Sequence, residues 1–388
     1  MQNRKASFLF VSTMNSAAWG GSEEAWFTAA LELSQKDHKV GCAFYDWPAK
    51  EARIIQLKEH GCEVYLLPNK GVTKKNITGR LLYLLKTKPA QRKAVHSLPV
   101  GKYDRVVISQ GGYKDVCSPV YSGWRQRLTA YCLLYHNYNR KYKFRATKAK
   151  LLRDWMTRAE ANIFAAHEAS VVIEAQLGFT VPHSATLINP ITFRKPVAAA
   201  PYPPAADDRY LFVMLAALAV VRKGQDRLIE VLSSAKWKER NWELQLFGGG
   251  KDRELIEGLI IRHGMQDKIF LRGFTDNVQR VLAGSHLLLQ LTHQDAMPLS
   301  VVEAMASGRP AVVSAIGDMP VWIKEGITGF ISPDMTIESI DAALERAWNK
   351  RSEWEAMGKK AFTYFSQKYP EDYGVYFLNL ISAFSSKR

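Results

Sequence analysis

The sequence predicts an α/β protein with two doubly wound parallel sheets, each covered by helices on both faces. Three observations support this fold class. The chain has 388 residues, more than one core of ordinary size requires. Strand-like apolar runs alternate with segments of helical spacing in both halves. Between 189 and 208, five prolines stand among small residues, which is typical of a linker between domains.

The first half of the chain begins this alternation at its amino end. Strands are predicted at 7–12, 40–44, 63–67, 105–109 and 133–135, and helices at 23–34 and 51–60. The segment 23–34 is expected to be helical because Ala25, Ala29 and Leu33 recur at the spacing of one helix face. We therefore expect a first Rossmann-like domain over 1–190.

The second half repeats the pattern after a linker over 191–207. Strands are predicted at 210–216, 242–247, 269–271, 287–291 and 311–314, and helices at 225–233 and 252–263. The chain has no fixed-period repeat, which argues for two related domains rather than a solenoid. We expect the second domain over 208–365, and residues 369–384 have the aromatic and aliphatic spacing of a further helix.

Positive charge is concentrated in one stretch. The net charge is +16, and twenty Lys and Arg stand against four Asp and Glu between Lys74 and Glu160. That difference equals the whole net charge, and aromatic residues interleave with the cations between 135 and 145. Such a stretch suits an anionic membrane surface or a nucleic acid. A solvated face without a partner is the alternative.

The cysteines and the apolar segments predict the cellular compartment of the chain. Four cysteines occur, without Cys-x-x-Cys spacing or neighbouring histidines that would fit zinc: Cys42, Cys62, Cys117 and Cys132. They are expected to be buried free thiols of a cytosolic protein. The apolar run near the amino end is too short for a signal peptide, and the longest other run, 211–221, has roughly half of a membrane-spanning length.

The most specific pattern lies between 292 and 314. Two carboxylates, Asp295 and Glu303, stand eight residues apart around a predicted helix start near Pro298 or Leu299. Each carboxylate can accept hydrogen bonds from the hydroxyls of a polyol.

The start of that helix is a candidate phosphate site. Pro298, Leu299 and Ser300 lead into it, and first-turn amides lack partners within the helix. They also carry the positive end of the helix dipole, which favours anions. A phosphate flanked by two hydroxyl-binding carboxylates describes a nucleotide sugar.

Residues 295–310 resemble the donor-site signature of the GT-B glycosyltransferases of family GT4. The signature has two acids eight residues apart and then Ala-Met-Ala-x-Gly-x-Pro, which 304–310 match throughout. The resemblance implies that Asp295 contacts the donor sugar and Glu303 the ribose, although the first acid of the family is usually Glu. It also implies two Rossmann-like domains facing a cleft, with the last helix, in 366–388, packing back on the first domain.

The element Arg222-Lys223-Gly224 resembles the family's Lys-Gly element, in which the lysine neutralises the donor diphosphate. A leaving phosphate gathers charge as the glycosidic bond breaks, so a fixed cation stabilises the transition state more than the ground state. Ala217 and Leu218 stand where the family usually carries an arginine. Arg222 is expected to take its place.

Further positions follow the family's donor site in sequence. Gly248 and Gly249 end a strand as its glycine loop does, and Arg272 and Asn277 fall in the stretch beside the nucleobase. A plain loop is the alternative for the glycines. Val321 replaces an acid that many members carry.

In the first domain, Gly20 and Gly21 resemble the family's glycine loop after strand one, where backbone approaches the donor phosphate or the acceptor. The turn does not supply Gly-x-Gly-x-x-Gly, so a nicotinamide enzyme is disfavoured. His136 follows a predicted strand where members often place a histidine facing the donor sugar. Membership of the basic surface is the alternative for this histidine.

The resemblance implies a retaining hexosyltransferase that uses a nucleoside diphosphate sugar of UDP or GDP type. No Asp-x-Asp occurs in the chain, so no metal is expected. The expected acceptor is a glycan or lipid-linked hydroxyl in the assembly of lipopolysaccharide, another cell-surface polysaccharide or a glycolipid. We expect a cytoplasmic enzyme, peripheral at an anionic inner membrane face, with no nucleic-acid partner. The alternative is a catalytically inactive GT-B binding protein for nucleic acid or acidic glycan.

Overall fold

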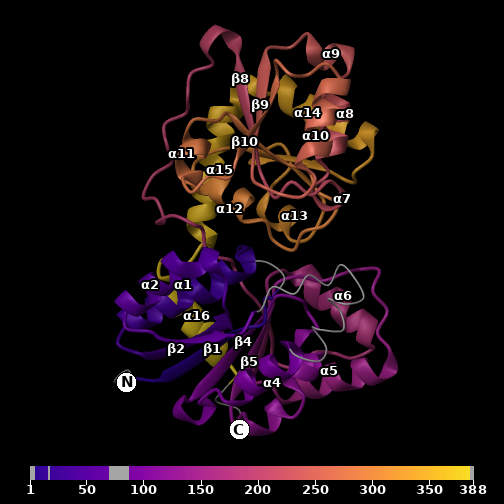
Figure 1. Ribbon diagram of the computed structural model, residues 1–388. Helices are drawn as coiled ribbons and strands as arrows, with labels where there is room; N and C mark the ends of the chain where they lie inside the picture. Colours follow the sequence, from indigo (N-terminus) through magenta and orange to yellow (C-terminus); the bar gives the residue numbers. More distant parts are fainter. Residues whose placement is uncertain (1–4, 16–17, 70–86, 385–388) are drawn as a thin grey trace. The chain divides into compact units, whose positions relative to one another are not determined.

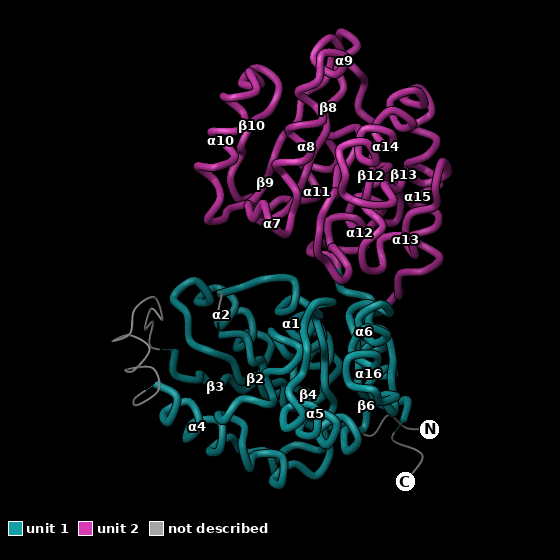
Figure 2. Tube along the Cα trace, turned by 90° about the vertical axis from the view of Figure 1, so that its right-hand side faces the viewer, with its two compact units in different colours: residues 1–190, 372–388 teal, residues 191–371 magenta. Residues whose placement is uncertain are grey.

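The computed structural model describes residues 5–15, 18–69 and 87–384 (Figure 1). The chain divides into two compact units, which Figure 2 separates by colour. Unit 1 comprises residues 1–190 and 372–388, and unit 2 comprises residues 191–371. Each unit is a parallel sheet with helices on its faces, so the predicted fold class is confirmed.

Unit 1 is built on a seven-stranded parallel sheet in the order β3-β2-β1-β4-β5-β6-β7. Its strands are β1 (Ser7–Ser12), β2 (Lys39–Tyr45), β3 (Glu63–Leu67), β4 (Arg105–Gln110), β5 (Tyr131–Tyr135), β6 (Ala161–Phe164) and β7 (Ser184–Thr186). Its main helices are α1 (Gly21–Gln35), α2 (Glu51–Glu59), α4 (Lys88–His96), α5 (Ala146–Arg158), α6 (His167–Leu177) and α16 (Tyr373–Ser382). The central strands are almost wholly buried because helices cover both faces of the sheet.

The last helix, α16, completes the core of unit 1. It packs against α1 and β6, and its Phe377 ring lies 5.8 Å from the ring of Phe10. Phe377 and Ile381 are fully buried, which explains the apolar spacing of this segment. The boundary differs from the expected start at 366, since residues up to Lys368 end the preceding helix and belong to unit 2.

Unit 2 is built on a six-stranded parallel sheet in the order β10-β9-β8-β11-β12-β13. Its strands are β8 (Tyr210–Leu215), β9 (Trp242–Phe247), β10 (Ile269–Gly273), β11 (Leu287–Gln290), β12 (Ala311–Ser314) and β13 (Gly329–Ser332). Its helices are α7 (Val220–Lys223), α8 (Gln225–Leu232), α9 (Ala235–Lys238), α10 (Arg253–Arg262), α11 (Val278–Ala283), α12 (Leu299–Ala306), α13 (Met319–Trp322), α14 (Ile337–Asn349) and α15 (Trp354–Lys368). The indole rings of Trp242, Trp348 and Trp354 pack against Tyr210 or Phe212 in the core of this unit.

The proline-rich segment is fastened to unit 2 by a buried arginine. Arg309 is fully buried, and its guanidinium donates to the carbonyls of Ala200 at 3.1 Å and Pro201 at 2.6 Å. It also donates to the carbonyls of Leu282 and Ala283 at the end of α11. A buried cation is tolerated when its donors are satisfied in this way. The segment expected as a linker therefore follows the surface of unit 2.

The strand order of each sheet reverses at one point. In unit 1 the reversal lies between β1 and β4, and in unit 2 between β8 and β11. Open α/β sheets bind ligands outside the carboxyl ends of the strands at such a point, because the connections there leave in opposite directions. Among the predicted site residues, Gly20 and Gly21 follow β1, Lys223 follows β8 and Asp295 follows β11.

Two other sequence expectations are addressed by the fold. All four cysteines are buried free thiols, as predicted. Within the described ranges, no helix combines the length and apolarity needed to cross a bilayer. The basic stretch from Lys74 is described from residue 87 onward, and its part from 74 to 86 lies outside the described residues.

Candidate functional site

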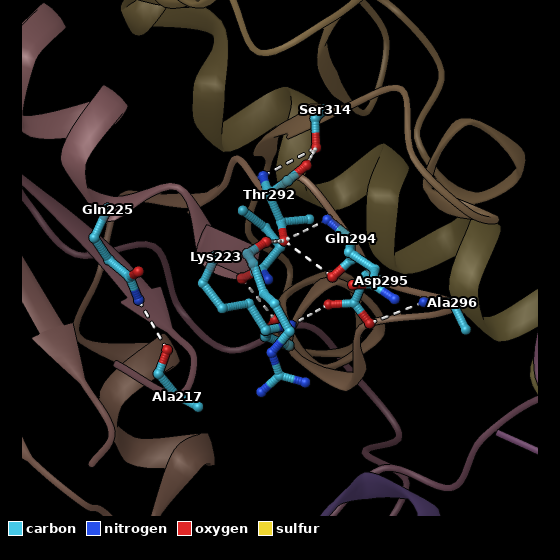
Figure 3. Close-up of polar contacts among 11 residues, drawn as sticks. Ala217, Lys223, Gln225, Thr292, Gln294, Asp295, Ala296 and Ser314 are labelled. Atoms are coloured by element: carbon cyan, nitrogen blue, oxygen red, sulfur yellow. Dashed lines mark hydrogen bonds and ion pairs between the residues drawn. The ribbon is translucent and has the colours of Figure 1, made fainter. Parts of the chain in front are cut away.

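The structure brings Lys223 and Asp295 together at the reversal point of unit 2 (Figure 3). Lys223 ends α7, which follows β8, and Asp295 lies in the loop after β11. The ammonium donates to Asp295 Oδ2, and the two side chains are only 15% and 16% exposed. Partial burial strengthens this ion pair relative to one in water. A cation and an acid from opposite sides of the reversal thus form one charged centre.

Backbone and hydroxyl contacts fix the loop that carries Asp295. The Arg222 carbonyl accepts from Thr292 Oγ1 at 2.5 Å and from the amides of His293 and Gln294. The Thr292 amide donates to Ser314 Oγ, which donates back to the Thr292 carbonyl at 2.8 Å. The Arg222 side chain is exposed, so its backbone rather than its guanidinium joins the two loops. The sequence pattern singled out neither Thr292 nor Ser314.

A turn at Gly317 packs against the loop that carries Asp295. Gly317 has a φ of +57°, and a Cβ there would lie 2.0 Å from the Ala296 carbonyl oxygen. The next amide, of Asp318, donates to that oxygen at 2.9 Å. Only glycine combines this φ with so close an approach. Val321, which replaces the family acid, lies exposed beyond the turn.

Glu303 lies in the second turn of α12 and is only 3% exposed. Its Oε1 accepts from the Thr192 amide at 2.9 Å and from Thr192 Oγ1 at 2.5 Å. Bonds to a carboxylate are among the stronger hydrogen bonds in proteins. Glu303, the residue predicted to bind the ribose, is therefore hydrogen-bonded to the segment that begins unit 2. No local sequence pattern predicts this partner, because Thr192 lies 111 residues away.

The start of α12 has the predicted form. Pro298 is the N-cap residue and Leu299 the first helical residue, so the amides of the first turn lie at this end. The Ser300 hydroxyl donates to Gln290 Oε1 at 3.2 Å and is buried, so its side chain serves the interior of the unit. The available anion-binding groups of this element are main-chain amides.

In the glycine loop after β9, close packing requires glycine at two positions. Gly248 has a φ of +137°, and a Cβ there would lie 2.1 Å from the Ala216 carbonyl oxygen. At Gly250 a Cβ would lie 2.2 Å from the Leu218 carbonyl oxygen. Gly249 is exposed with open space around its Cβ position. The loop lies directly against the loop that leads from β8 toward Lys223.

The two residues expected beside the nucleobase, Arg272 and Asn277, have side chains that bind other residues of unit 2. Arg272 pairs with Glu243 at 3.2 Å, toward the amino end of β9, so its guanidinium points away from the carboxyl ends of the strands. Asn277 caps α11, because its Oδ1 accepts from the Arg280 amide at 3.0 Å. The structure does not gather either side chain with Lys223.

In unit 1 the glycine turn after β1 is anchored by a buried acid. Gly20 is extended at the N-cap of α1 and Gly21 is exposed, while Glu23 is fully buried. Glu23 accepts from Ser12 Oγ at 2.8 Å and from the buried ammonium of Lys50 at 3.1 Å. Breaking a buried pair of this kind is costly, so the pair holds the turn in place.

His136 follows β5 at the same sheet edge. Its Nε2 lies 2.9 Å from Ser109 Oγ, at the end of β4. Its Nδ1 is buried without a partner among the described residues. Burial lowers the pKa of this imidazole to about 4, so the ring is neutral near pH 7. A neutral imidazole can position a hydroxyl group but carries no charge toward the basic surface.

A match to a known protein family falls within unit 2. The family model described as glycosyl transferases group 1 matches residues 201–364. The match covers most of unit 2 and less than half of the chain. The matched segment contains the Lys223–Asp295 pair and α12, and so covers the charged centre of unit 2.

Curated relatives align with parts of the chain. The N-acetyl-alpha-D-glucosaminyl L-malate synthase of Bacillus anthracis is 34% identical over 89 residues, which are 23% of each protein. The poly(glycerol-phosphate) alpha-glucosyltransferase of Bacillus subtilis is 27% identical over 128 residues, 33% of this chain and 19% of the relative. The chain spans less than half the length of the curated relatives that it matches.

A solved structure covers nearly the whole chain. The Anabaena protein HepE in complex with UDP has a TM-score of 0.73 at 14% identity and covers 97% of this chain and 100% of its own. Together with the two parallel sheets, this likeness establishes the GT-B fold.

Proposed function

We propose that the protein is a retaining glycosyltransferase that moves a hexose from a nucleoside diphosphate sugar, of UDP or GDP type, to an acceptor hydroxyl. One observation carries the proposal. Lys223 and Asp295, 72 residues apart in sequence, meet at the strand reversal of a group 1 glycosyl transferase unit. That place in an α/β sheet suits a phosphate-bearing ligand, and the pair offers one cation and one hydroxyl acceptor.

Donor binding exchanges the partners of this pair. The diphosphate carries more negative charge than one carboxylate, so it draws the Lys223 ammonium away from Asp295. Asp295 is then free to accept a hydrogen bond from a hydroxyl of the donor sugar. The exchange ties the recognition of the sugar to the recognition of the diphosphate.

The transfer replaces one bond at the anomeric carbon by another on the same face. The bond from this carbon to the leaving phosphate oxygen breaks, and the bond to the acceptor oxygen forms. The acceptor proton passes to the leaving phosphate, and Lys223 stabilises the charge that gathers there. Amides in the first turn of α12 supply further donors to phosphate. No metal ion has a part in this proposal, and activity in EDTA equal to activity in Mg²⁺ is its check.

Glu303 is assigned to the ribose of the nucleotide. Its carboxylate is bound to Thr192 in the structure, so ribose hydroxyls reach it by taking over contacts made by Thr192. A carboxylate already oriented by two donors is preorganised for such an exchange.

The acceptor is assigned to a glycan or lipid-linked hydroxyl, in cell-surface polysaccharide or glycolipid assembly at the cytoplasmic face of a membrane. The Bacillus subtilis relative named for poly(glycerol-phosphate) supports a polyol-containing acceptor. His136 is assigned to acceptor positioning, because its ring is neutral and lies at the carboxyl ends of β4 and β5.

A panel of UDP-, GDP- and ADP-sugars tests the proposal. Binding of each donor and release of free nucleotide are measured for the wild type and for Asp295→Asn, which keeps the size of the side chain but not its charge. We expect turnover with one donor class and a large loss in the variant. Equal donor affinity and turnover in both proteins would reject the assignment of the site.

A second candidate is a binding protein of GT-B fold without turnover. It is favoured because the residues proposed to bind the donor already contact other residues of the protein. Lys223 is paired with Asp295, and Glu303 is hydrogen-bonded to Thr192. Tight polyanion or RNA binding, with no nucleotide released from any donor, would establish this candidate.

A further inference from the structure

An aromatic and basic cluster lies in unit 1, in the segments that follow β4 and β5. Tyr113, Tyr142 and Phe144 meet edge to face, with ring centroids 4.9 to 6.0 Å apart. The Lys114 ammonium lies 3.1 Å from the centroid of the Tyr142 ring. We call these four residues the aromatic–lysine cluster. A cation held over an aromatic face keeps its charge and loses much of its conformational freedom.

The cluster is joined to the edge of the sheet where His136 lies. Its two segments follow β4 and β5, whose labels are adjacent in Figure 1. The Tyr113 amide donates to Asn137 Oδ1 at 3.4 Å, and Asn137 Nδ2 donates to the Gly111 carbonyl at 2.5 Å. Asn137 is the neighbour of His136 in the chain. A chain bound along the cluster therefore reaches the residue assigned to the acceptor hydroxyl.

Exposed cations continue from the cluster into the start of α5. They are Lys141, Lys143, Arg145 and Lys148. In the described part of the chain, none of these four forms an ion pair with an acid. The segment 111–150 contains one acid, Asp115, whose carboxylate accepts from Thr13 Oγ1 and the Gly112 amide at 2.7 Å. Lysines gathered without counter-ions create a positive potential that attracts polyanions.

We infer that the aromatic–lysine cluster and its four neighbouring cations bind the phosphate groups of an anionic acceptor glycan. The inference deepens the proposed function and rests on it. Lys114 supplies a positioned charge beside the acceptor site, and the exposed lysines follow successive phosphates along the chain. The repeating unit recognised is a polyol or sugar linked through phosphodiesters.

A membrane surface and a nucleic acid fit these observations less well. The exposed large hydrophobic residues in the described part of unit 1 are scattered over five elements: Ile55, Leu66, Leu151, Val171 and Val375. They form no contiguous face for insertion into a bilayer. Nucleobases stack on open aromatic faces. Here Tyr113 is buried and Lys114 covers the Tyr142 ring, so the rings are used within the cluster.

The test uses poly(glycerol phosphate) as the probe and the full chain as the protein. The variant carries Lys141→Gln, Lys143→Gln and Lys148→Gln. The matched control carries Lys58→Gln, Lys93→Gln and Lys102→Gln, which are exposed lysines of the same unit and remove the same charge. Affinity is measured by calorimetry at several salt concentrations, beside neutral dextran, phosphatidylglycerol vesicles and a single-stranded RNA oligomer.

We expect the wild type to bind poly(glycerol phosphate) in preference to dextran, vesicles and RNA. The cluster variant is expected to bind it about tenfold more weakly at low salt and with a shallower salt dependence, because fewer counter-ions are displaced. The control is expected to match the wild type. Equal loss in both variants, or preferential binding of vesicles or RNA, would overturn the inference.

Nucleotide release from the donor panel is measured on the same preparations. If the wild type releases no nucleotide while only the cluster variant loses the polymer, the proposed transfer fails and the polyanion site stands. If the wild type turns over a donor and both variants bind the polymer equally, the site fails and the proposed transfer stands.

Discussion

The two units share an architecture and differ in how they use charge. In unit 2 the charges at the strand reversal are paired, Lys223 with Asp295, in surroundings that are largely closed to water. In unit 1 the group at the corresponding edge is a neutral imidazole, His136, and the exposed Lys141, Lys143 and Lys148 that follow it form no ion pair with an acid of the described residues. Paired charges suit a ligand that brings both a phosphate and hydroxyls. Unpaired surface charges suit a ligand that brings negative charge alone.

The difference also concerns rigidity. In unit 2 two of the site's carbonyl oxygens, those of Ala216 and Ala296, each lie where a glycine allows a close backbone approach. In unit 1 a fully buried ion pair between Glu23 and Lys50 fixes the glycine turn. Both units thus fix the backbone around a site, one by packing and the other by electrostatics. Substitutions in the two units separate these contributions.

The largest effect is expected for Lys223→Ala. Removing the cation from the leaving phosphate should lower kcat about 100- to 1000-fold, as the loss of one preorganised donor does in other enzymes. Steady-state rates with the preferred donor measure it. The control is Lys359→Ala, which removes an exposed lysine paired with Glu355 in the same unit. A loss of similar size in the control would remove the special role of Lys223.

A second test compares adjacent glycines in the loop after β9. Gly248→Ala is expected to lower the free energy of unfolding by about 3 kcal/mol, because φ is positive and the new Cβ meets the Ala216 carbonyl. Gly249→Ala has open space and should change stability little. Urea unfolding of both variants decides the point. Equal stabilities would mean that packing does not require the first glycine.

Thr192→Val tests the contact that holds Glu303. The variant keeps the Thr192 amide bond and loses the hydroxyl bond of 2.5 Å, so the free energy of unfolding should fall by about 1.5 kcal/mol. Nucleotide affinity, followed by calorimetry, should rise by a few fold, because the ribose hydroxyls then have one Thr192 contact fewer to displace from Glu303. Thr192→Ser retains the hydroxyl and should restore both values. Failure of the serine variant to do so would show that shape rather than hydrogen bonding matters at this position.

The smallest effect is expected for the pH dependence of His136. The pKa of this imidazole is about 4 in the folded chain and about 6.5 when unfolded, so below pH 6.5 the unfolded chain binds the extra proton. Stability should therefore fall as the pH drops from 6.5 to 4, by about 1 kcal/mol once the partial solvent contact of this half-buried ring is allowed for. In His136→Gln this part of the pH dependence should vanish.

The measurement for this last test is urea unfolding of the wild type and variant at each pH. His96→Gln, a substitution at a surface histidine of α4, is the control and should follow the wild type. Parallel curves for wild type and His136→Gln would contradict a buried neutral ring.

Much of the fold could be predicted because local apolar patterns are strong where strands are buried on both faces. The bounds of β1, β3, β9 and β12 agree with the runs read from the sequence. The shorter strands β6, β7 and β13 were not predicted. β7 has three residues, none of them fully buried, so it carries little apolar pattern to detect.

The candidate site was predicted in its residue types and not in its contacts. Asp295, Glu303 and the helix start at Leu299 could be identified from spacing. The pairing of Lys223 with Asp295, and of Glu303 with Thr192, could not, since the partners lie 72 and 111 residues apart. Arg272 lies in a stretch that resembles the family's nucleobase site, yet its side chain forms an ion pair with Glu243 on the neighbouring strand.

Residue types and short spacings were enough to predict two α/β units, a first unit rich in positive charge and a glycosyl transferase signature in the second unit. These properties depend on residue type and on spacing over a few turns. Only the tertiary structure decided which strands are neighbours, and therefore which acid faces Lys223 and which hydroxyl holds Glu303. The physical reason is that a parallel sheet joins segments distant in sequence, so contacts at its carboxyl edge follow strand order rather than chain order.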